Sequence, residues 1–465
     1  MSSTTAPAPM IETRNPATGT LLQSYAVHSI SEVEQRLAAG HGAFARWKET
    51  SLDDRAAVVR GVAAYLRREK ARLAILMTTE MGKPIVESEA EVEKCAWCCE
   101  YYAESAQRHL ADDAIATSAT RSYVAFRPLG VILAIMPWNF PFFQVIRFAV
   151  PAIMAGNVAV LKHAANVTGC GLELERIFAA CGMPDGVFTT LVVPGRAMDS
   201  IIRDPRVSAV TFTGSEQAGA SVASAAAGSL KKTVLELGGS DAYIVLSDAD
   251  VTAAAQTAVR ARFQNTGQSC IAAKRFIIDT SVYEEFLVSF AERARSLVVG
   301  DPLNRATQVG PLAREDLRGD IERQVDATVA LGAKIALGGK RLDGTGFFYE
   351  PTLIADVTPG MPMFDEETFG PAAAVIRARD TDHAIALANA SIYGLGGNLW
   401  TRDVKSAEAI AARLESGAVF INGMTASDPR LPFGGVKRSG YGRELSYFGI
   451  REFTNVQTVW VGPAV

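Results

Sequence analysis

The sequence predicts an α/β protein built on parallel sheets, and two observations carry that prediction. Between residues 130 and 246, short apolar runs of strand length alternate with segments of helix length, and a second such alternation runs from about residue 250 to 416. Strands that alternate with helices form parallel sheets, because each return to the next strand needs a crossover. With 465 residues, two or three domains are expected.

Composition narrows the class of protein. The chain is 48% hydrophobic and 21% charged, which is ordinary for a globular enzyme, and a net charge of −4 argues against nucleic-acid binding. Six cysteines imply no disulfide framework and fit a reducing, cytoplasmic location. Met1–Thr20 lacks a basic segment followed by an apolar run, so it does not have the pattern of a secretory signal.

Two stretches invite a wrong interpretation. Cys95, Cys98 and Cys99 have the spacing of a redox or metal pair, but they fall inside a helical pattern without a second Cys or His pair, so no metal is expected. Pro128–Ile146 is uncharged and almost long enough to span a bilayer. Its three prolines favour a buried strand followed by a loop.

The first part of the chain is predicted to be helical. Ser31–Glu49, Asp53–Glu80 and Val86–Leu110 have helical patterns, and in the second the apolar residues fall on one face. Arg121–Arg127 then alternates like an exposed strand.

The sheet-forming region follows. The predicted strands are Gly130–Met136, Asn157–Lys162, Val187–Val193, Ser208–Phe212, Thr233–Glu236 and Ala242–Leu246. The predicted helices between them are Gln144–Ala155, Thr168–Cys181, Ala197–Arg203 and Gln217–Ala227. Near the end, Val419–Asn422 is a further strand, Pro432–Gly440 a glycine-rich loop, and Thr454–Val461 has β character. Ligands are expected at the carboxyl ends of the parallel strands.

Cys270 is the candidate nucleophile. It ends the polar, Gly-containing stretch from Phe263 to Ile271, where turn residues let the backbone approach a ligand and present a thiol. A thiolate nucleophile needs donors for an oxyanion and a base. Asn139, in the turn Pro137–Pro141, has an amide suited to the first task, and Glu236, on an apolar strand end, suits the second. For the turn that holds Asn139, the alternative is a stiff connection with a packed Trp. For Glu236, it is an acid that caps a neighbouring helix or pairs with an Arg.

Three further features could hold a phosphate or a ribose. Lys162 ends a buried strand, and Gly214-Ser215 opens a helix with Gly219 one turn later, although the spacing differs from the GxGxxG fingerprint. Glu366-Glu367 could present a carboxylate to ribose hydroxyls. Taken singly, Lys162 is equally compatible with a solvent-facing strand end, and Gly214-Ser215 could also be a plain helix cap. The Glu366-Glu367 stretch, taken alone, is only a turn.

Together, and in this order, these pieces resemble the aldehyde dehydrogenase superfamily over nearly the whole chain, and most closely its bacterial succinate-semialdehyde dehydrogenases. The matching segments are Pro137–Pro141, Lys162, Phe212–Gly219, Glu236–Gly239, Gly267–Cys270, Glu367–Pro371 and Pro432–Gly440. The resemblance implies that Cys270 attacks the aldehyde, that Asn139 and the Cys270 N–H stabilise the oxyanion, and that Glu236 activates water to hydrolyse the thioester. Oxidation without a metal is implied, with NAD or NADP as the hydride acceptor.

The resemblance also implies a cofactor site and three structural parts. The implied cofactor-binding residues are Trp138, Lys162, Ala165, Gly214, Ser215, Gly219, Leu237, Glu367 and Phe369. The implied parts are a Rossmann-like dinucleotide-binding domain (1–113 and 129–236), a Rossmann-like catalytic domain (237–430), and a small β oligomerisation extension with the C-terminal arm (114–128 and 431–465). Such an extension builds homodimers or homotetramers.

Departures from the family pattern bear on specificity. Ala165 stands where strongly NAD-preferring members have a Glu, so NADP should be accepted, with His163 or Asn166 assisting. Gln264 stands where some semialdehyde enzymes place a carboxylate-binding Arg. Arg147 matches another carboxylate-binding Arg of that group, and Ser427 could add a hydroxyl.

We therefore expect NAD(P)-dependent oxidation of succinate semialdehyde to succinate. Glutarate semialdehyde or another small aliphatic aldehyde is the alternative substrate. A non-catalytic protein that reuses the fold is a third hypothesis, and a thiol esterase is a fourth. The presence of Cys270 and Glu236 opposes the third, and the cofactor elements make esterase chemistry a side activity.

Overall fold

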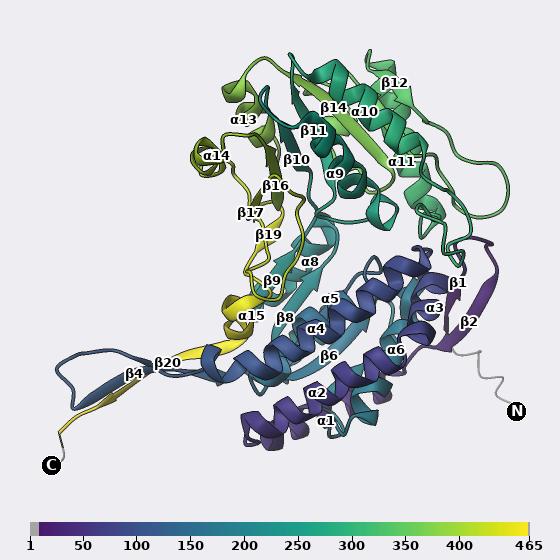
Figure 1. The fold of residues 1–465 in the computed structure, drawn as a ribbon. Coiled ribbons are helices and arrows are strands. Elements are labelled where there is room, and N and C mark those ends of the chain that lie inside the picture. Colours follow the sequence, from purple (N-terminus) through teal and green to yellow (C-terminus); the bar gives the residue numbers. More distant parts are fainter. Residues whose placement is uncertain (1–8, 464–465) are drawn as a thin grey trace, which may run out of the picture.

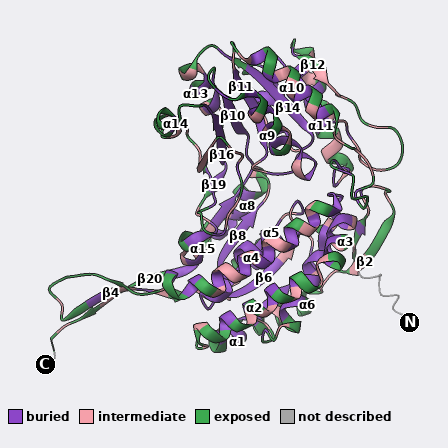
Figure 2. Cartoon of the chain, viewed as in Figure 1, coloured by how far each residue is buried: buried purple, intermediate pink, exposed green. Residues whose placement is uncertain are grey.

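The computed structural model of the chain describes residues 9–463 and has the predicted mixed α/β fold, with two large parallel-strand sheets (Figure 1). The first eight residues of the Met1–Thr20 segment lie outside this range. Helices cover both sheets, whose central strands are almost entirely buried (Figure 2). Such buried strands read as continuous apolar runs, which is why the sequence predicted most strands of the first sheet. In the second sheet it predicted two strands by residue, Ala242–Leu246 and Val419–Asn422, and the others only as a general alternation of strands and helices.

The first sheet has six strands in the order β19-β9-β8-β5-β6-β7. Their bounds are β5 Val131–Met136, β6 Val158–His163, β7 Phe188–Thr190, β8 Val207–Thr213, β9 Lys232–Glu236 and β19 Gly440–Tyr441. All pairs are parallel except β19 with β9. The chain runs from β5 outward to β7 and then returns to β8 on the other side of β5. This reversal between β5 and β8 is a topological switch point, where open α/β sheets bind ligands.

β7 is shorter than predicted. The strand ends at Thr190: the Leu191 N–H still donates to the Leu161 carbonyl of β6, and Val192 then bonds to the N-terminal segment instead. The N–H of His28 donates to the Val192 carbonyl, and the N–H of Val192 donates to the His28 ring.

The first five helices pack in the half of the molecule that holds this sheet (Figure 1). Their bounds are α1 Ile30–Trp47, α2 Leu52–Arg68, α3 Lys70–Met81, α4 Ile85–His109 and α5 Phe143–Met154. The prediction of a single helix over Asp53–Glu80 was wrong. Backbone angles of φ −95° and ψ 9° at Glu69 separate α2 from α3, at a residue that carries no Gly or Pro signal. Cys95, Cys98 and Cys99 lie fully buried in the apolar core, as expected.

The second sheet has seven strands in the order β12-β13-β14-β11-β10-β16-β17, all parallel except β12. Their bounds are β10 Asp241–Val245, β11 Ala273–Asp279, β12 Lys334–Leu337, β13 Thr352–Ala355, β14 Ala372–Ala378, β16 Gly396–Trp400 and β17 Ala418–Ile421. The remaining helices are α6 Thr168–Ala180, α7 Met198–Arg203, α8 Glu216–Ala227, α9 Val251–Phe263, α10 Tyr283–Arg295, α11 Glu315–Ala330, α12 Pro362–Asp365, α13 Thr381–Asn389, α14 Val404–Ala411 and α15 Ser446–Glu452.

A small antiparallel sheet projects away from both large ones (Figure 1). It joins β3 Asp113–Ala114, β4 Arg121–Pro128 and the C-terminal β20 Thr454–Val461. β20 pairs with β4 along its whole length, from Thr454 opposite Pro128 to Val461 opposite Arg121. The expected β extension is therefore present, built from two segments far apart in the sequence.

Some elements were not predicted. Met10–Arg14 (β1) and Leu21–Ala26 (β2) form an antiparallel hairpin, and β15 Tyr393–Gly394 pairs with β18 Val436–Lys437. These strands are short or mostly exposed, so they lack an apolar run. The uncharged stretch from 128 to 146 consists of β5, a turn and the start of α5, and no helix within residues 9–463 is long and apolar enough to cross a membrane.

Candidate active site

The turn that precedes Cys270 has an unusual backbone. Asn265 and Thr266 both have φ of +56°, and Gly267 follows with φ of +72°. Left-handed backbone at two non-glycine residues is strained and persists only where the surroundings enforce it. A Cβ on Gly267 would lie 2.2 Å from the Gly370 carbonyl oxygen, so only glycine fits there. The stretch before Cys270 therefore has the tight backbone that its polar and glycine residues predicted.

Two buried cations fix this turn. The Arg262 guanidinium donates to the carbonyls of Gly267, Gly370 and Ala273 at 2.6, 2.7 and 2.9 Å. Lys274 Nζ donates to the carbonyls of Ser269 and Cys270 at 3.0 and 2.8 Å. Charged donors give stronger hydrogen bonds than neutral ones, so the backbone on both sides of Cys270 is held rigidly. Neither residue was singled out from the sequence, because nothing local shows that a Lys at the start of a strand or an Arg near the end of a helix is buried.

Cys270 itself is partly exposed, and it faces a cavity. Burial raises the pKa of its thiol to about 12, whereas Arg147 and Lys274 act to lower it. Glu367 and Glu236 raise it further, which places both carboxylates within electrostatic range of the sulfur. Glu236, predicted at the end of a strand, and Glu367, predicted in a turn, therefore both act on Cys270.

Asn139 lies beside the Cys270 turn. Its side-chain amide donates to the Gln268 carbonyl at 3.1 Å, and Asn265 donates to the Asn139 carbonyl at 2.8 Å. Gln144 donates to the Asn139 side-chain oxygen at 3.3 Å, which fixes the orientation of the amide. The amide has a second N–H, so Asn139 can donate to an oxygen atom that develops charge near the sulfur.

Glu236 ends β9 with its carboxyl group buried. Neither carboxylate oxygen has a hydrogen-bond partner within residues 9–463. Burial, followed by the Glu444 carboxylate, raises the pKa of Glu236 well above its usual range, whereas Arg147 lowers it. A buried acid with a raised pKa and free oxygens is suited to accept a proton from water.

Arg147 has its own partner. Its Nε lies 2.5 Å from a carboxylate oxygen of Glu444, and its guanidinium lies over the Phe433 ring at 4.6 Å. The side chain is 3% exposed. Glu444 was not predicted, because it lies in the glycine-rich C-terminal segment where only the loop pattern was visible. Arg147 thus has an ion-pair partner inside the protein, although burial raises the pKa of Glu444 more than Arg147 lowers it.

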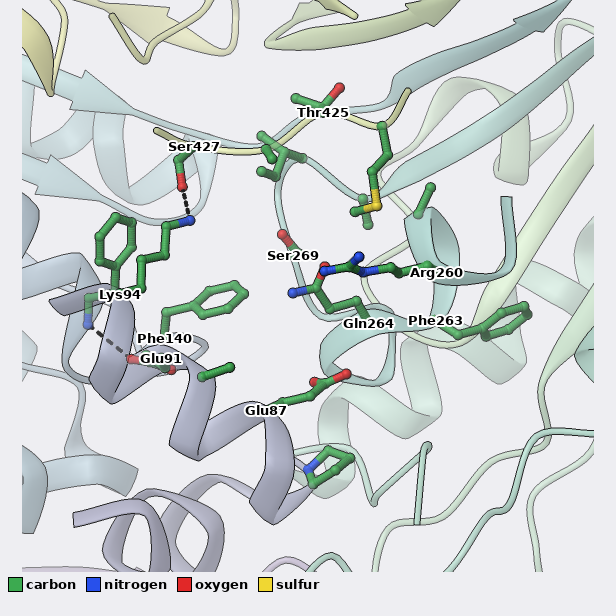
Figure 3. Close-up of a pocket in the computed structure, with 18 of the residues that line it drawn as sticks. Glu87, Glu91, Lys94, Phe140, Arg260, Phe263, Gln264, Ser269, Thr425 and Ser427 are labelled. Carbon is green, nitrogen blue, oxygen red and sulfur yellow. Dashed lines mark hydrogen bonds between the residues drawn. The ribbon is translucent and has the colours of Figure 1, made fainter. Parts of the chain in front are cut away.

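A cavity of about 800 Å³ opens beside Cys270. Its lining comes mainly from α4, α5, α9, the Cys270 turn and the segments 305–308 and 424–427, and it includes Arg147, Gln264 and Ser427. Figure 3 shows Gln264 and Ser427 on this lining. The structure therefore brings the three predicted substrate residues to one cavity with the nucleophile. Lys94 and Arg260 also line it and were not predicted from the sequence, because on helices each resembled an ordinary surface cation.

The predicted cofactor residues gather at the carboxyl edge of the first sheet. In the strand register, Lys162 lies opposite Ile135, Ile135 opposite Phe212, and Thr213 opposite Glu236. The switch point between β5 and β8 is therefore bordered by Lys162, by the turn after β5 and by the Gly214-Ser215 turn. Burial lowers the pKa of Lys162, whose ammonium makes no ion pair in the part of the chain described.

Gly214, Ser215 and Gly219 form the start of α8. The Ser215 hydroxyl accepts the Ala218 N–H and caps the helix. A Cβ on Gly219 would lie 2.4 Å from Leu237, so this glycine lets α8 pack closely against the loop after β9. The helix N-terminus carries a partial positive charge that suits a phosphate.

Glu367 and Phe369 approach from the second sheet. Glu367 accepts the Gly239 N–H at 2.9 Å and lies 3.7 Å from Lys274 Nζ. Phe369 contacts Trp138 edge to face, with ring centroids 5.7 Å apart.

The residues near Lys162 fit a dinucleotide, with one correction. His163 cannot assist a 2′-phosphate, because its buried ring bonds to the Pro141 carbonyl and to the Ala164 N–H. Burial lowers the pKa of His163 to about 4, so the ring is neutral. The buried Asn166 side-chain nitrogen, in contrast, has no partner within residues 9–463, and Ala165 is exposed. The Lys162 ammonium has no ion-pair partner and the Asn166 amide nitrogen no hydrogen-bond partner within residues 9–463. Both groups suit an adenosine ribose or its phosphate.

Comparison with known proteins agrees with this geometry. Residues 3–459 match the model of the aldehyde dehydrogenase family. A probable NADP(+) succinate-semialdehyde dehydrogenase from Synechocystis sp. is 50% identical over 97% of this chain and 99% of its own. The NADP(+) succinate-semialdehyde dehydrogenase 1 of Mycobacterium tuberculosis is 51% identical over the same shares.

A solved structure is similar throughout. The succinic semialdehyde dehydrogenase of Streptococcus pyogenes, crystallised with NADP+ as the cofactor, superposes with a TM-score of 0.95 and is 36% identical. The match covers 97% of this chain and all of that one. The resemblance seen in the motifs thus extends over the whole fold, and the chain belongs to the aldehyde dehydrogenase family.

Proposed function

We propose that this enzyme oxidises succinate semialdehyde to succinate with NADP or NAD. The observation that carries the proposal is the cavity that joins Cys270 to cationic side chains, since an aldehyde with a distal carboxylate needs both. Two enzymes named for this activity are about 50% identical to this chain in sequence, which supports the proposal. Glutarate semialdehyde remains the alternative, because the cavity volume leaves room for a longer chain.

The chain's own residues would act in two stages. Cys270 Sγ adds to the aldehyde carbon, while Asn139 and the Cys270 N–H donate to the resulting oxyanion. The nicotinamide, when bound, supplies the hydride acceptor. Glu236 then takes a proton from water, which attacks the thioester on Cys270 and releases the carboxylate. The rigid turn built on Arg262 and Lys274 keeps the sulfur in place during both stages.

The proposed cofactor site lies at the carboxyl edge of the first sheet. Lys162 and Glu367 would hold ribose hydroxyls, Trp138 and Ser215 would contact the pyrophosphate, and Phe369 would pack near the nicotinamide ribose. Gly214, Gly219 and Leu237 would let the backbone and α8 come close enough. Asn166, with its free amide, would assist at the adenosine ribose.

Ala165→Glu is expected to shift cofactor use toward NAD. A carboxylate at this exposed position, three residues after Lys162, would repel a 2′-phosphate and accept hydrogen bonds from ribose hydroxyls. The ratio of kcat/KM for NADP to that for NAD should fall on the order of tenfold or more. Ala165→Gln, which adds a similar volume without charge, is the control. If Ala165→Glu and Ala165→Gln gave the same ratio of kcat/KM for NADP to that for NAD, the 2′-phosphate of the cofactor would not lie beside residue 165.

The substrate is tested by steady-state kinetics of the purified protein with both cofactors. The panel contains succinate semialdehyde, glutarate semialdehyde and butanal. The proposal expects the highest kcat/KM for succinate semialdehyde. A higher kcat/KM for glutarate semialdehyde would select the alternative substrate. A kcat/KM for butanal equal to that for succinate semialdehyde would show that the enzyme does not recognise the carboxylate.

The wider organisation is also part of the proposal. Residues 1–113 and 129–236 would form the dinucleotide-binding domain, 237–430 the catalytic domain, and 114–128 with 431–465 the oligomerisation extension. Val456 and Trp460 on β20 are more than half exposed, which favours a homodimer or homotetramer built through this sheet. Six free cysteines favour the reducing cytoplasm.

A further inference from the structure

One buried ammonium group binds most of the backbone around Cys270. The Lys274 side chain is fully buried on β11. Its Nζ donates to three backbone carbonyls, those of Ser269, Cys270 and Ala272, at 3.0, 2.8 and 3.1 Å. An ammonium group has three N–H donors, and these three carbonyls use all of them. The Glu367 carboxylate lies 3.7 Å from Nζ, beyond the distance of a good hydrogen bond.

The same residues form a β-turn. The Ala272 N–H donates to the Ser269 carbonyl at 3.1 Å, which makes Cys270 the second residue of the turn. Among residues 9–463, no group accepts a hydrogen bond from the Cys270 N–H. This donor is therefore available to a ligand beside the sulfur.

The Ser269 carbonyl and the Cys270 N–H belong to one peptide unit. Because that unit is planar and trans, its C=O and N–H point in opposite directions. Lys274 holds the carbonyl on one side, so the N–H is directed to the other side. Rotation of this peptide would break the bonds from Lys274 and from the Ala272 N–H together.

The charge of Lys274 adds what the turn alone does not supply. Hydrogen bonds from a charged donor are stronger than those from a neutral one, such as the Ala272 N–H. A cation bonded to the carbonyl also polarises the peptide, so that the N–H at its other end becomes a stronger donor. Lys274 is thus suited both to orient and to strengthen the Cys270 N–H.

We propose that Lys274 positions and polarises the Ser269–Cys270 peptide, so that the Cys270 N–H stabilises the oxyanion. The inference rests on the proposed function, because an oxyanion forms only if Cys270 attacks a carbonyl carbon. In that attack an S–C bond forms and the C=O π electrons move to oxygen. Lys274 does not touch the substrate in this account, so it is a positioning residue.

The test compares two reactions of the same sulfur atom. Oxidation of succinate semialdehyde with NADP passes through an oxyanion, whereas methylation by iodomethane does not, since an S–C bond forms and iodide leaves. The measured quantity is the ratio of kcat/KM for oxidation to the rate constant for methylation of Cys270. Peptide mass spectrometry follows the methylation in the absence of cofactor. A change in the thiol pKa alters both rates at a given pH and cancels in the ratio.

Lys274→Met should lower this ratio on the order of 10- to 100-fold, because loss of a whole oxyanion donor costs about 10² to 10³ in kcat and here the Cys270 N–H itself remains. The fall should appear in kcat with little change in KM, since the oxyanion forms only after the aldehyde has bound. Lys274→Gln, which keeps two uncharged N–H donors, should lower the ratio less. It also carries the test if Lys274→Met does not fold.

Arg275→Met is the matched control. Arg275 is the next residue of β11, is 2% exposed, and also donates to backbone carbonyls. Its acceptors are the carbonyls of Ser240, Leu387 and Ala388, none of which belongs to the turn that carries Cys270. Arg275→Met should lower the Tm and leave the ratio unchanged. An equal fall in the ratio would assign the effect to the loss of any buried cation and overturn the inference.

The peptide can also be observed without substrate or cofactor. Ser269–Cys270 is the only Ser-Cys pair in the sequence, so carbonyl-¹³C serine combined with ¹⁵N cysteine gives one NMR signal for this peptide. The carbonyl ¹³C resonance should move upfield in Lys274→Gln, because a neutral donor polarises the carbonyl less, and should stay in place in Arg275→Met. An unmoved resonance in Lys274→Gln would contradict the proposed polarisation.

The outcomes separate the inference from the proposed function. Wild-type protein that is methylated at Cys270 but oxidises no aldehyde would overturn the proposed function itself. Wild-type protein that oxidises the aldehyde, with a ratio that Lys274→Met and Lys274→Gln both leave unchanged, would overturn only the role of Lys274.

Discussion

Cys270→Ala is expected to abolish aldehyde oxidation. The substitution removes the only atom proposed to bond to the substrate carbon, and loss of a covalent nucleophile lowers kcat by a factor on the order of 10⁴ or more. Little stability should be lost, because the backbone of the turn is held by Arg262 and Lys274 and not by the thiol. Steady-state NADPH formation with succinate semialdehyde measures the first effect, and thermal unfolding measures the second.

Cys181→Ala is the matched control. Cys181 is also partly exposed, but it lies at the C-terminal end of α6, outside the residues that line the Cys270 cavity. This variant should retain wild-type turnover. Full turnover in Cys270→Ala, with Cys181→Ala equally active, would refute the thioester mechanism.

Glu236→Gln is expected to stop the reaction after one turnover. Glutamine keeps the size of the buried side chain but cannot take a proton from water, so hydrolysis of the thioester should slow by about 10² to 10⁴. Rapid mixing with aldehyde and NADP should then give one burst of NADPH per active site, followed by a very slow phase. The wild-type protein should continue without such a break.

Glu292→Gln, at an exposed position on α10, controls for the charge change and should behave like the wild type. Unchanged steady-state turnover in Glu236→Gln would assign water activation to another group. Loss of the burst itself would instead show that Glu236 is already needed when Cys270 attacks the aldehyde.

Much of this site could be predicted because its residues lie at marked places in the sequence. Asn139, Lys162 and Glu236 each follow or end an apolar strand, and parallel strands bring such ends to one edge. The turn before Cys270 was visible in its polar and glycine residues, and the structure adds its left-handed backbone at Asn265 and Thr266.

The rest of the site depended on tertiary contacts. Lys94 looked like a surface residue on an amphipathic helix, and its position in the cavity depends on how α4 packs on α5. Glu444 and Arg147 are about 300 residues apart, so nothing local indicates their ion pair. The break between α2 and α3 at Glu69 escaped prediction for a related reason, since no Gly or Pro marks it.

The most direct test of the mechanism is to find the acyl group. Glu236→Gln is mixed with succinate semialdehyde and NADP, quenched in acid, digested and analysed by peptide mass spectrometry. The account predicts one succinyl group on the peptide that contains Cys270, and none on peptides with the other cysteines. NADPH released without any acyl group on Cys270 would contradict it.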